Sequence, residues 1–295
     1  MRQRIKSWIL PISIVGGCIT HEWIDYLTPI SLVLLFCMLL ITYCRINPRD
    51  LKFDKVHFIM LAVQMAMAAI VYALFIIFDK TVAVGLFMCV FIPTATAAPI
   101  VTGLLGGDIV RVATYSLLCN FVVALIGPAI LAAIGDNYNI SFVDSFTRIC
   151  IKVIPLLIGP MVVAFSLRKF WRKAHIVISN HQSISFYLWA VALFIVVGSS
   201  VSFIIERFSW NIAPTIIYLT IGSALVCVVQ FYVGRQLGQR CGEPISVAQS
   251  LAQKNTILAI WMTLTFLDPI TSIAPAAYMA WHNLFNSWQL MHKNH

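Results

Sequence analysis

Long apolar segments recur along the whole chain, and they limit its possible folds more than any other feature. Hydrophobic residues make up 60% of the 295 residues, whereas charged residues make up only 11%. Many of the apolar runs reach the length of about 20 residues that an α-helix needs to cross a bilayer. Soluble globular proteins have a far more polar composition. The sequence therefore predicts an all-α polytopic membrane protein that is embedded in a lipid bilayer.

Charged clusters and turn residues divide the apolar sequence into ten expected membrane spans. Their approximate ranges are 7–20, 28–44, 56–78, 82–105, 109–134, 146–167, 184–205, 212–234, 244–267 and 270–290. No small-residue cleavage site follows the first of these spans. We therefore expect that span to be a retained helix rather than a signal peptide.

Basic residues collect at alternate ends of the expected spans. They are Arg2, Arg4, Lys6, Arg45, Arg49, Lys52, Lys55, Arg111, Arg168, Lys169, Arg172, Lys173, Arg235, Arg240 and Lys293. The opposite ends carry only Lys80, Arg148, Lys152 and Arg207. An excess of positive charge marks the cytoplasmic side of a membrane protein. We therefore expect both termini in the cytoplasm, and a location in a bacterial inner (plasma) membrane. This topology accounts for the net charge of +9, so no nucleic-acid partner is expected.

Ten spans with both ends on one side divide into two five-helix repeats of opposite orientation, at about 7–134 and 146–291. Inverted repeats of this kind are typical of secondary transporters. We expect the chain, 1–295, to form a single transporter unit.

The fourth span of each repeat contains residues that interrupt a helix. In the first repeat they are Pro93 and Pro99, and in the second they are Pro244 and the polar run that extends to Asn255. Proline lacks a backbone donor and clashes with the preceding turn, so we expect both helices to break. Ordinary proline kinks are the alternative. Breaks at matching positions predict a substrate site near the midplane of the membrane.

Three motifs lie in these segments and in the last span. They are the run from Pro93 to Asp108, the sequence SLAQKN from Ser250 to Asn255, and Trp281 with His282 and Asn283. Together they resemble motifs of the bile acid:sodium symporter family. The similarity covers about residues 55–134 and 243–291.

The resemblance implies a fold in which the broken helices 4 and 9 cross. It also implies a core of helices 3–5 and 8–10, at about 56–134 and 212–291, and a panel of helices 1, 2, 6 and 7. Members of that family carry organic anions such as bile acids, keto acids and pantoate by alternating access. A small organic anion is therefore the expected substrate.

The sequence departs from that family where its members bind sodium. The expected oxygen ligands are replaced at Ala98, Pro99, Ser250 and Lys254, whereas Gln64 and Ser116 remain. We therefore expect sodium-independent transport, with no metal site and no cofactor. Sodium-coupled symport through the residual ligands is the alternative.

Lys254 is a lone cation within an apolar part of the chain. A charge at bilayer depth costs about 2.5–3.5 kcal/mol, so such residues usually have a function. All eleven carboxylates fall at the ends of apolar segments, which leaves Lys254 without an obvious acidic partner. We expect Lys254 to substitute for sodium and to form an anion pocket with Thr96, Asn255 and the half-helix N-termini. Desolvation disfavours the charged amine, which predicts proton coupling. A permanently charged lysine would instead give uniport or exchange, and an amine that only fills the vacated cavity would be structural.

Other polar residues have both a functional and a structural interpretation. Thr96 and Asn255 can bind a carboxylate or cap the half-helices, while His282 and Asn283 can line the cytoplasmic path or be packed in the interior. No hydrolase, metalloprotease or P-loop motif occurs, so we expect no enzyme activity. An inorganic ion/proton antiporter or arsenite carrier is the main rival, and a membrane enzyme or sensor is a weaker one. No feature of the sequence indicates an oligomeric state.

Overall fold

The computed structural model describes residues 12–13, 15–46, 51–135, 141–207 and 210–292. Throughout these ranges the regular structure is helical, apart from one isolated bridge between Thr94 and Lys254. Residues 7–11 and 14 of the expected first span, 7–20, lie outside them, and residues 12–13 and 15–19 are helical.

The elements of the first half are α2 (His21–Ile24), η1 (Asp25–Leu27), α3 (Thr28–Arg45), α4 (Lys55–Phe75), α5 (Lys80–Phe91), α6 (Ala98–Leu105) and α7 (Ile109–Ile134). Those of the second half are α8 (Phe142–Phe170), α9 (Arg172–Asn180), α10 (Gln182–Arg207), α11 (Ala213–Gln239), α12 (Pro244–Ala252), α13 (Thr256–Phe266), η2 (Pro269–Ser272) and α14 (Ile273–His292). The fourth expected span of each half is thus divided into two helices, α5 with α6 and α12 with α13.

Four helices in the described part of the chain, α4, α7, α8 and α11, are long and apolar enough to cross a membrane. The outer faces of α4 and α11 expose large apolar side chains, among them Ile70, Leu74, Ile221 and Leu225. Soluble proteins rarely expose apolar surface of this extent. The helices therefore indicate an integral membrane protein.

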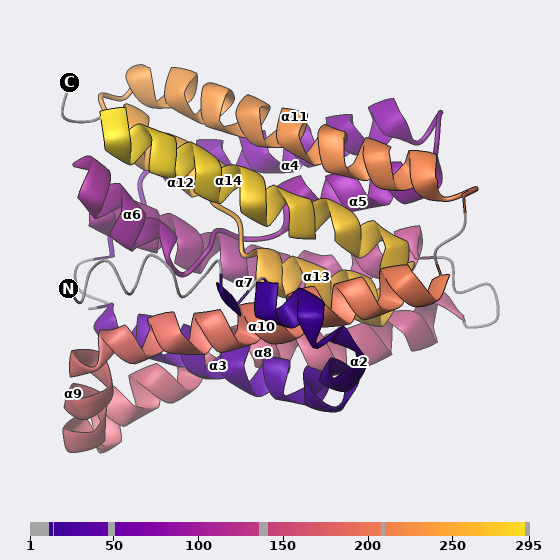
Figure 1. Ribbon diagram of the computed structural model, residues 1–295. Helices are drawn as coiled ribbons and strands as arrows, with labels where there is room; N and C mark the ends of the chain where they lie inside the picture. Colours follow the sequence, from indigo (N-terminus) through magenta and orange to yellow (C-terminus); the bar gives the residue numbers. More distant parts are fainter. Residues whose placement is uncertain (1–11, 14, 47–50, 136–140, 208–209, 293–295) are drawn as a thin grey trace.

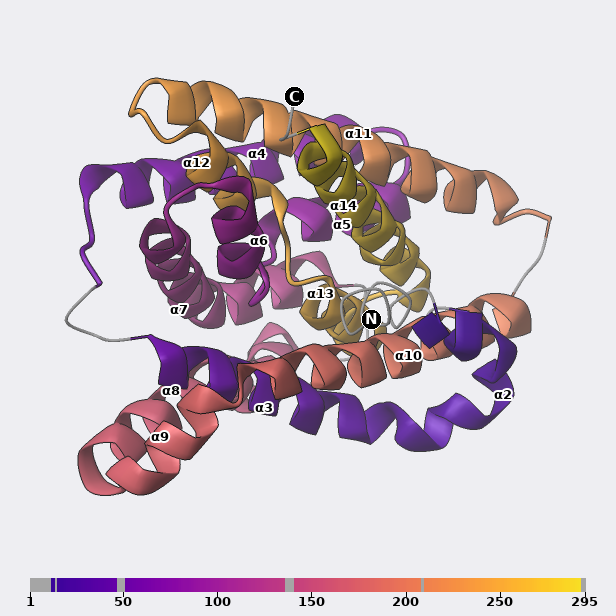
Figure 2. The same cartoon turned by 60° about the vertical axis from the view of Figure 1, so that its left-hand side comes forward.

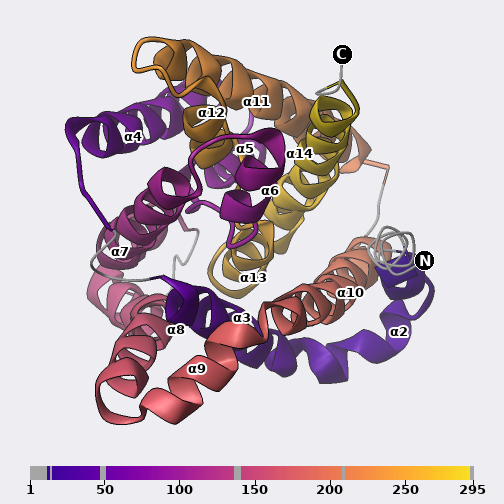
Figure 3. The same cartoon turned by 90° about the vertical axis from the view of Figure 1, so that its left-hand side faces the viewer.

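The helices are arranged in two layers (Figure 3). The panel layer consists of α2, α3, α8 and α10, in which α3 packs against α8 and α10. The core layer consists of α4 to α7 and α11 to α14, in which α4 packs on α5 and α11 packs on α12 and α14. Figure 2 shows α6 and α13 on the side of the core layer that faces α3 and α10. The two layers contact each other mainly through α7 with α8 and α10 with α13.

The close packing of α11 and α12 depends on glycine. A β-carbon at Gly234 would lie 2.6 Å from the Cα of Ala248, which is too close for any side chain. One turn later, a β-carbon at Gly238 would lie 2.6 Å from the Cα of Pro244. These two glycines let α12 lie directly against the backbone of α11.

Helix caps gather at one end of the molecule, where α4 and α7 begin. Asp54 caps α4 by accepting hydrogen bonds from the amides of Val56 and His57, and it pairs with the Arg111 guanidinium at 2.8 Å. Partial burial opposes ionisation of Asp54, but the hydrogen bonds and charges of His57 and Arg111 lower its pKa overall. Asp108 caps α7 in the same way. Figure 1 shows that the end of α14, α9 and the end of α11 lie at this same end.

Candidate functional site

The two interrupted segments cross and pair with each other. The Asn255 amide donates a hydrogen bond to the Pro93 carbonyl at 2.9 Å, and the Ala95 amide donates one to the Gln253 carbonyl at 2.8 Å. These two bonds flank an antiparallel bridge between Thr94 and Lys254. Backbone groups buried away from water must be paired, so each segment supplies the partners that the other loses by leaving its helix.

The prolines near the two helix breaks do not all have the role that the sequence predicted. Pro93 lies within the first break, as expected for a residue that interrupts a helix, whereas Pro99 lies in the first turn of α6. Pro244, however, begins α12 instead of interrupting it, because proline is well tolerated in the first turn of a helix. The second break lies at residues 253–255, where Asn255 caps α13 by accepting a hydrogen bond from the Leu258 amide at 3.3 Å.

Four helix ends meet at this crossing. The helices α5 and α12 end there, and α6 and α13 begin there. Helix N-termini carry partial positive charge and unpaired amides, while C-termini carry partial negative charge. No side chain caps the N-terminus of α6. The crossing can therefore accommodate an anion on one side and a cation on the other.

Lys254 lies on the side of the crossing that faces the core layer. Its side chain is only 1% exposed, and its Nζ has no hydrogen-bond partner among the described residues. The thiols of Cys119 on α7 and Cys89 on α5 are its electrostatic neighbours. Thr94, its bridge partner, is equally buried and donates a hydrogen bond to the Ser250 carbonyl at 2.6 Å. The ammonium is thus held in the interior, close to the C-terminus of α5.

A cavity of about 430 Å³ lies between the crossing and the panel layer, and Lys254 borders it as well. Its polar lining combines residues of the crossing and α14 with residues of α3, namely Thr42, Arg45, Thr96, Gln253, Lys254, Asn255, Thr256, His282 and Asn283. Met38, Ile46, Ile100, Val110, Trp189 and Ile257 contribute much of the apolar wall. No carboxylate is among the described residues that line it.

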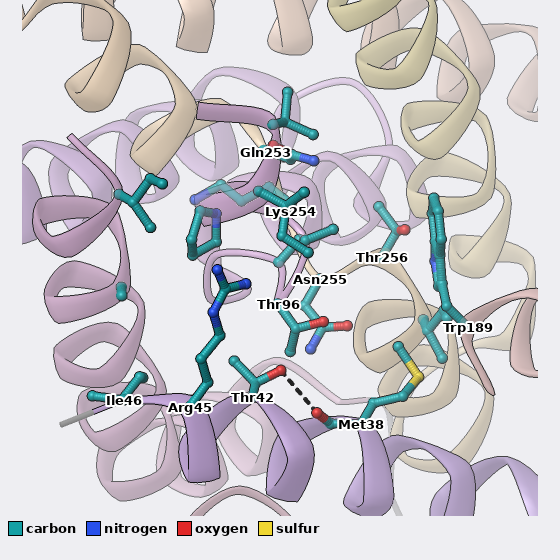
Figure 4. A pocket seen from close by; sticks show the side chains of 18 of the residues that line it. Met38, Thr42, Arg45, Ile46, Thr96, Trp189, Gln253, Lys254, Asn255 and Thr256 are labelled. Carbon is teal, nitrogen blue, oxygen red and sulfur yellow. Dashed lines mark hydrogen bonds between the residues drawn. The ribbon is translucent and has the colours of Figure 1, made fainter. Parts of the chain in front are cut away.

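Figure 4 shows how the two sides of the cavity face each other. Thr96 and Asn255 lie side by side and project from the crossing toward α3. The guanidinium of Arg45 extends from the end of α3 toward the crossing. Thr42 donates a hydrogen bond to the Met38 carbonyl at 2.8 Å, which leaves its oxygen free to accept another.

Several buried polar groups next to the cavity lack partners within the described ranges. They include Nδ2 of Asn255, Oε1 of Gln253, Nδ1 of His282 and Nζ of Lys254. Buried polar atoms are nearly always hydrogen-bonded, and exceptions call for an explanation such as an absent ligand. The cluster therefore has spare hydrogen-bonding capacity of the kind that a bound polar molecule would use.

The expected substrate-binding residues are brought together at this one place. Thr96, Asn255, His282 and Asn283 all line the cavity, although they come from three separate elements. His282 is 3% exposed, and the Asn283 amide donates a hydrogen bond to the Met279 carbonyl of its own helix at 2.8 Å. These residues can contribute both to a site and to the packing of α14.

The other expected coupling residues lie in the core layer, away from the cavity. The Gln64 amide donates to the carbonyls of Phe91 at 3.0 Å and Ile92 at 3.2 Å, which secures the end of α5. Ser116 donates to the Thr94 carbonyl at 3.4 Å. Ser250 is fully buried and its hydroxyl has no partner in the described part of the chain.

At the two remaining positions, Ala98 is buried and Pro99 lines the cavity. Within the described residues, no three or more histidine, cysteine, aspartate or glutamate side chains lie together in a way that could hold a metal ion.

Four polar cavity residues, Thr42, Arg45, Gln253 and Thr256, were not expected from the sequence. Gln253 and Thr256 could have been found from their positions beside Lys254 and Asn255. Thr42 and Arg45 could not have been found in this way. In the sequence, Arg45 indicates only which end of its helix is cytoplasmic. Their place in the cavity depends on how α3 packs across from the crossing.

Comparison with protein-family models and with curated proteins found no match to this chain. The functional interpretation therefore depends on the geometry of the crossing and its cavity.

Proposed function

We propose that this protein is a secondary transporter that carries a small organic anion across the membrane by alternating access. The observation that carries the proposal is the cavity beside the crossing. It combines Arg45, two half-helix N-termini and unpartnered amide groups with an apolar wall, and no acidic side chain lines its described part. Such a lining favours an anion over a cation.

The order of the elements supports a fold of ten spans in two inverted repeats. In the first repeat, α3, α4, the pair α5 and α6, and α7 follow one another. In the second, α10, α11, the pair α12 and α13, and α14 occur in the same order. Broken helices at equivalent positions of two repeats are where transporters bind their substrates. We further propose that both termini are cytoplasmic, because the basic residues gather at one end of the molecule.

The two-layer arrangement supports a division into moving parts. We propose that the core layer, about 56–134 and 212–291, rocks against the panel layer, as the resemblance to the bile acid:sodium symporter family implies. The cavity lies between the layers and contains Arg45 and Ile109 from the basic end of the molecule. This position is consistent with a cavity that opens toward the cytoplasm.

We propose that transport does not require sodium and that Lys254 supplies a fixed positive charge instead. The ammonium lies in the interior beside the C-terminus of α5, where the helix dipole favours a cation. Its attraction for an anion on the other side of the crossing is strengthened by the low dielectric of the interior.

Two rival functions have less support. Cation/proton antiporters need an acid within the membrane, and neither the cavity lining nor the described surroundings of Lys254 contain one. A membrane enzyme is the weaker rival, because no hydrolase, metalloprotease or P-loop motif occurs in the sequence.

Reconstitution of the purified protein into proteoliposomes tests this proposal. Binding is first screened by thermal shift with keto acids, pantoate-like hydroxy acids and bile acids, and flux of the binding compound is then measured in sodium and in choline media. We expect saturable flux of equal rate in both media. Binding of metal oxyanions or cations alone would overturn the anion assignment, and steep saturable sodium dependence would overturn the role of Lys254.

A further inference from the structure

Arg45 is the cation that the panel layer contributes to the cavity. It is the last residue of α3, and it has no hydrogen-bond or ion-pair partner within the part of the chain that the structure describes. Other cations at this end of the molecule are engaged, since Arg111 pairs with Asp54 at 2.8 Å and Arg168 donates to the Ile46 carbonyl at 3.5 Å. Arg45 instead extends toward the crossing (Figure 4).

The cavity thus has two separate polar ends. At the crossing, Thr96 and the unpartnered amide of Asn255 lie beside the N-termini of α6 and α13. On the panel layer, Arg45 supplies a guanidinium, which binds carboxylate or phosphate groups through paired hydrogen bonds. Apolar side chains, including Met38 and Ile257, occupy the walls between these ends.

The charges of the site also indicate how many negative charges the ligand carries. Lys254 behind the crossing and Arg45 in front of it carry two formal positive charges, and no described carboxylate in the lining offsets them. Lys254 is buried, whereas Arg45 is exposed, so the Arg45 guanidinium is accessible to a second acidic group. A ligand with two negative charges would match both cations, whereas a monoanion would pair with only one of them.

We propose that the substrate is an organic dianion that bridges the two layers. One acidic group binds at the crossing to Thr96, Asn255 and the half-helix N-termini, and the second binds to Arg45. This inference rests on the proposed function and names the substrate class of the same site. Because Arg45 belongs to α3 and the other donors belong to the core layer, only a ligand with two acidic groups holds both layers together.

Binding of matched acids and half-esters to the purified full-length protein tests the proposal. The probes are the straight-chain dicarboxylates from succinate to suberate, each compared with its monomethyl ester by calorimetry. We expect at least one diacid to bind more tightly than its ester by about tenfold or more, since a charge-assisted hydrogen bond is lost in the ester. Arg45→Gln should remove this preference, and Arg45→Lys should restore part of it.

Lys169→Gln is the matched control, because Lys169 also lies at the basic end of the molecule but does not line the cavity. It should keep the preference for the diacid. Equal binding of diacids and half-esters, with Arg45→Gln unchanged, would overturn the inference and leave the proposed function intact. An equal loss of both ligands in Arg45→Gln would also overturn it, because a single acidic group would then bind at Arg45. Failure of every organic anion to bind the unaltered protein would overturn the proposed function as well.

Discussion

The two segments that cross in this protein have the same backbone role but very different side chains. The first, residues 92–97, consists of small or apolar residues and two threonines, with Pro93 inside it. The second, residues 253–255, consists of Gln253, Lys254 and Asn255. Each completes the hydrogen bonds of the other.

We infer from this difference in side chains that the two crossing segments have different roles. The first segment is interrupted by proline, so its extended shape is favoured by the local sequence. The second contains no proline, and pairing with the first segment and capping by Asn255 hold it open. The first segment would then be mainly a frame that adds Thr96 and the N-terminus of α6 to the site, whereas the second would carry Lys254 and Asn255.

Lys254→Gln should produce the largest effect of these substitutions. It tests directly whether the second crossing segment carries groups that bind the ligand. We expect anion affinity to fall by about tenfold or more, because the buried positive charge is lost. Stability should rise or stay the same, because an unpaired buried ammonium is itself costly. Calorimetry with the anion found in the screen and the melting temperature measure the two effects, with Lys254→Arg as the control that keeps the charge. Unchanged affinity in a folded Lys254→Gln protein would make Lys254 a structural residue.

Asn255→Asp separates capping from binding in the second segment. Aspartate caps a helix as well as asparagine, so the melting temperature should change little. The new carboxylate would repel an anion in the cavity, and affinity should fall severalfold or more. Asn255→Ala should show the opposite pattern, with a loss of about 1 kcal/mol of stability and a smaller loss of affinity. Equal affinity in Asn255→Asp and the unaltered protein would show that no anion binds next to Asn255.

Pro93→Ala tests whether the first segment is only a frame. Alanine keeps the carbonyl that accepts the Asn255 amide but makes the unfolded chain more flexible, so stability should fall by about 0.4–1 kcal/mol. Affinity for the anion should stay nearly the same. A large loss of affinity without a loss of stability would show that the first segment takes part in binding beyond its backbone.

Asp54→Asn should give the smallest effect. Because Asp54 lies far from the crossing, this variant is a control for the substitutions in the crossing segments. The folded-state pKa of Asp54 is lowered, so its contribution to stability is present above about pH 4, the ordinary pKa of aspartate, and is lost as the pH falls below that value. The melting temperature of Asp54→Asn should be lower than that of the unaltered protein at neutral pH, and the two should converge in acid. Anion affinity should be unchanged. A constant difference at every pH would assign the effect to capping alone.

Much of the architecture follows from local sequence. The expected spans from 28–44 onward correspond to helices or helix pairs, because a run of apolar residues in a membrane has to satisfy its backbone groups as a helix. The break around Pro93 is equally local. The second break was expected from Pro244 and the polar run that extends to Asn255. It lies at the end of that run, at residues 253–255, whereas Pro244 begins α12, because proline at the start of a helix is well tolerated.

What the sequence by itself determined is therefore the apolar helices, the side on which the basic residues gather, the polar segment around Lys254 and the grouping of Thr96 with Asn255. The tertiary structure decided that Lys254 lies behind the crossing near Cys89 and that Arg45 faces the cavity. The reason is that an extended segment places alternate side chains on opposite sides, and the sides are set only when the two segments pair. The place of Arg45 depends in turn on packing between two layers that no local pattern encodes.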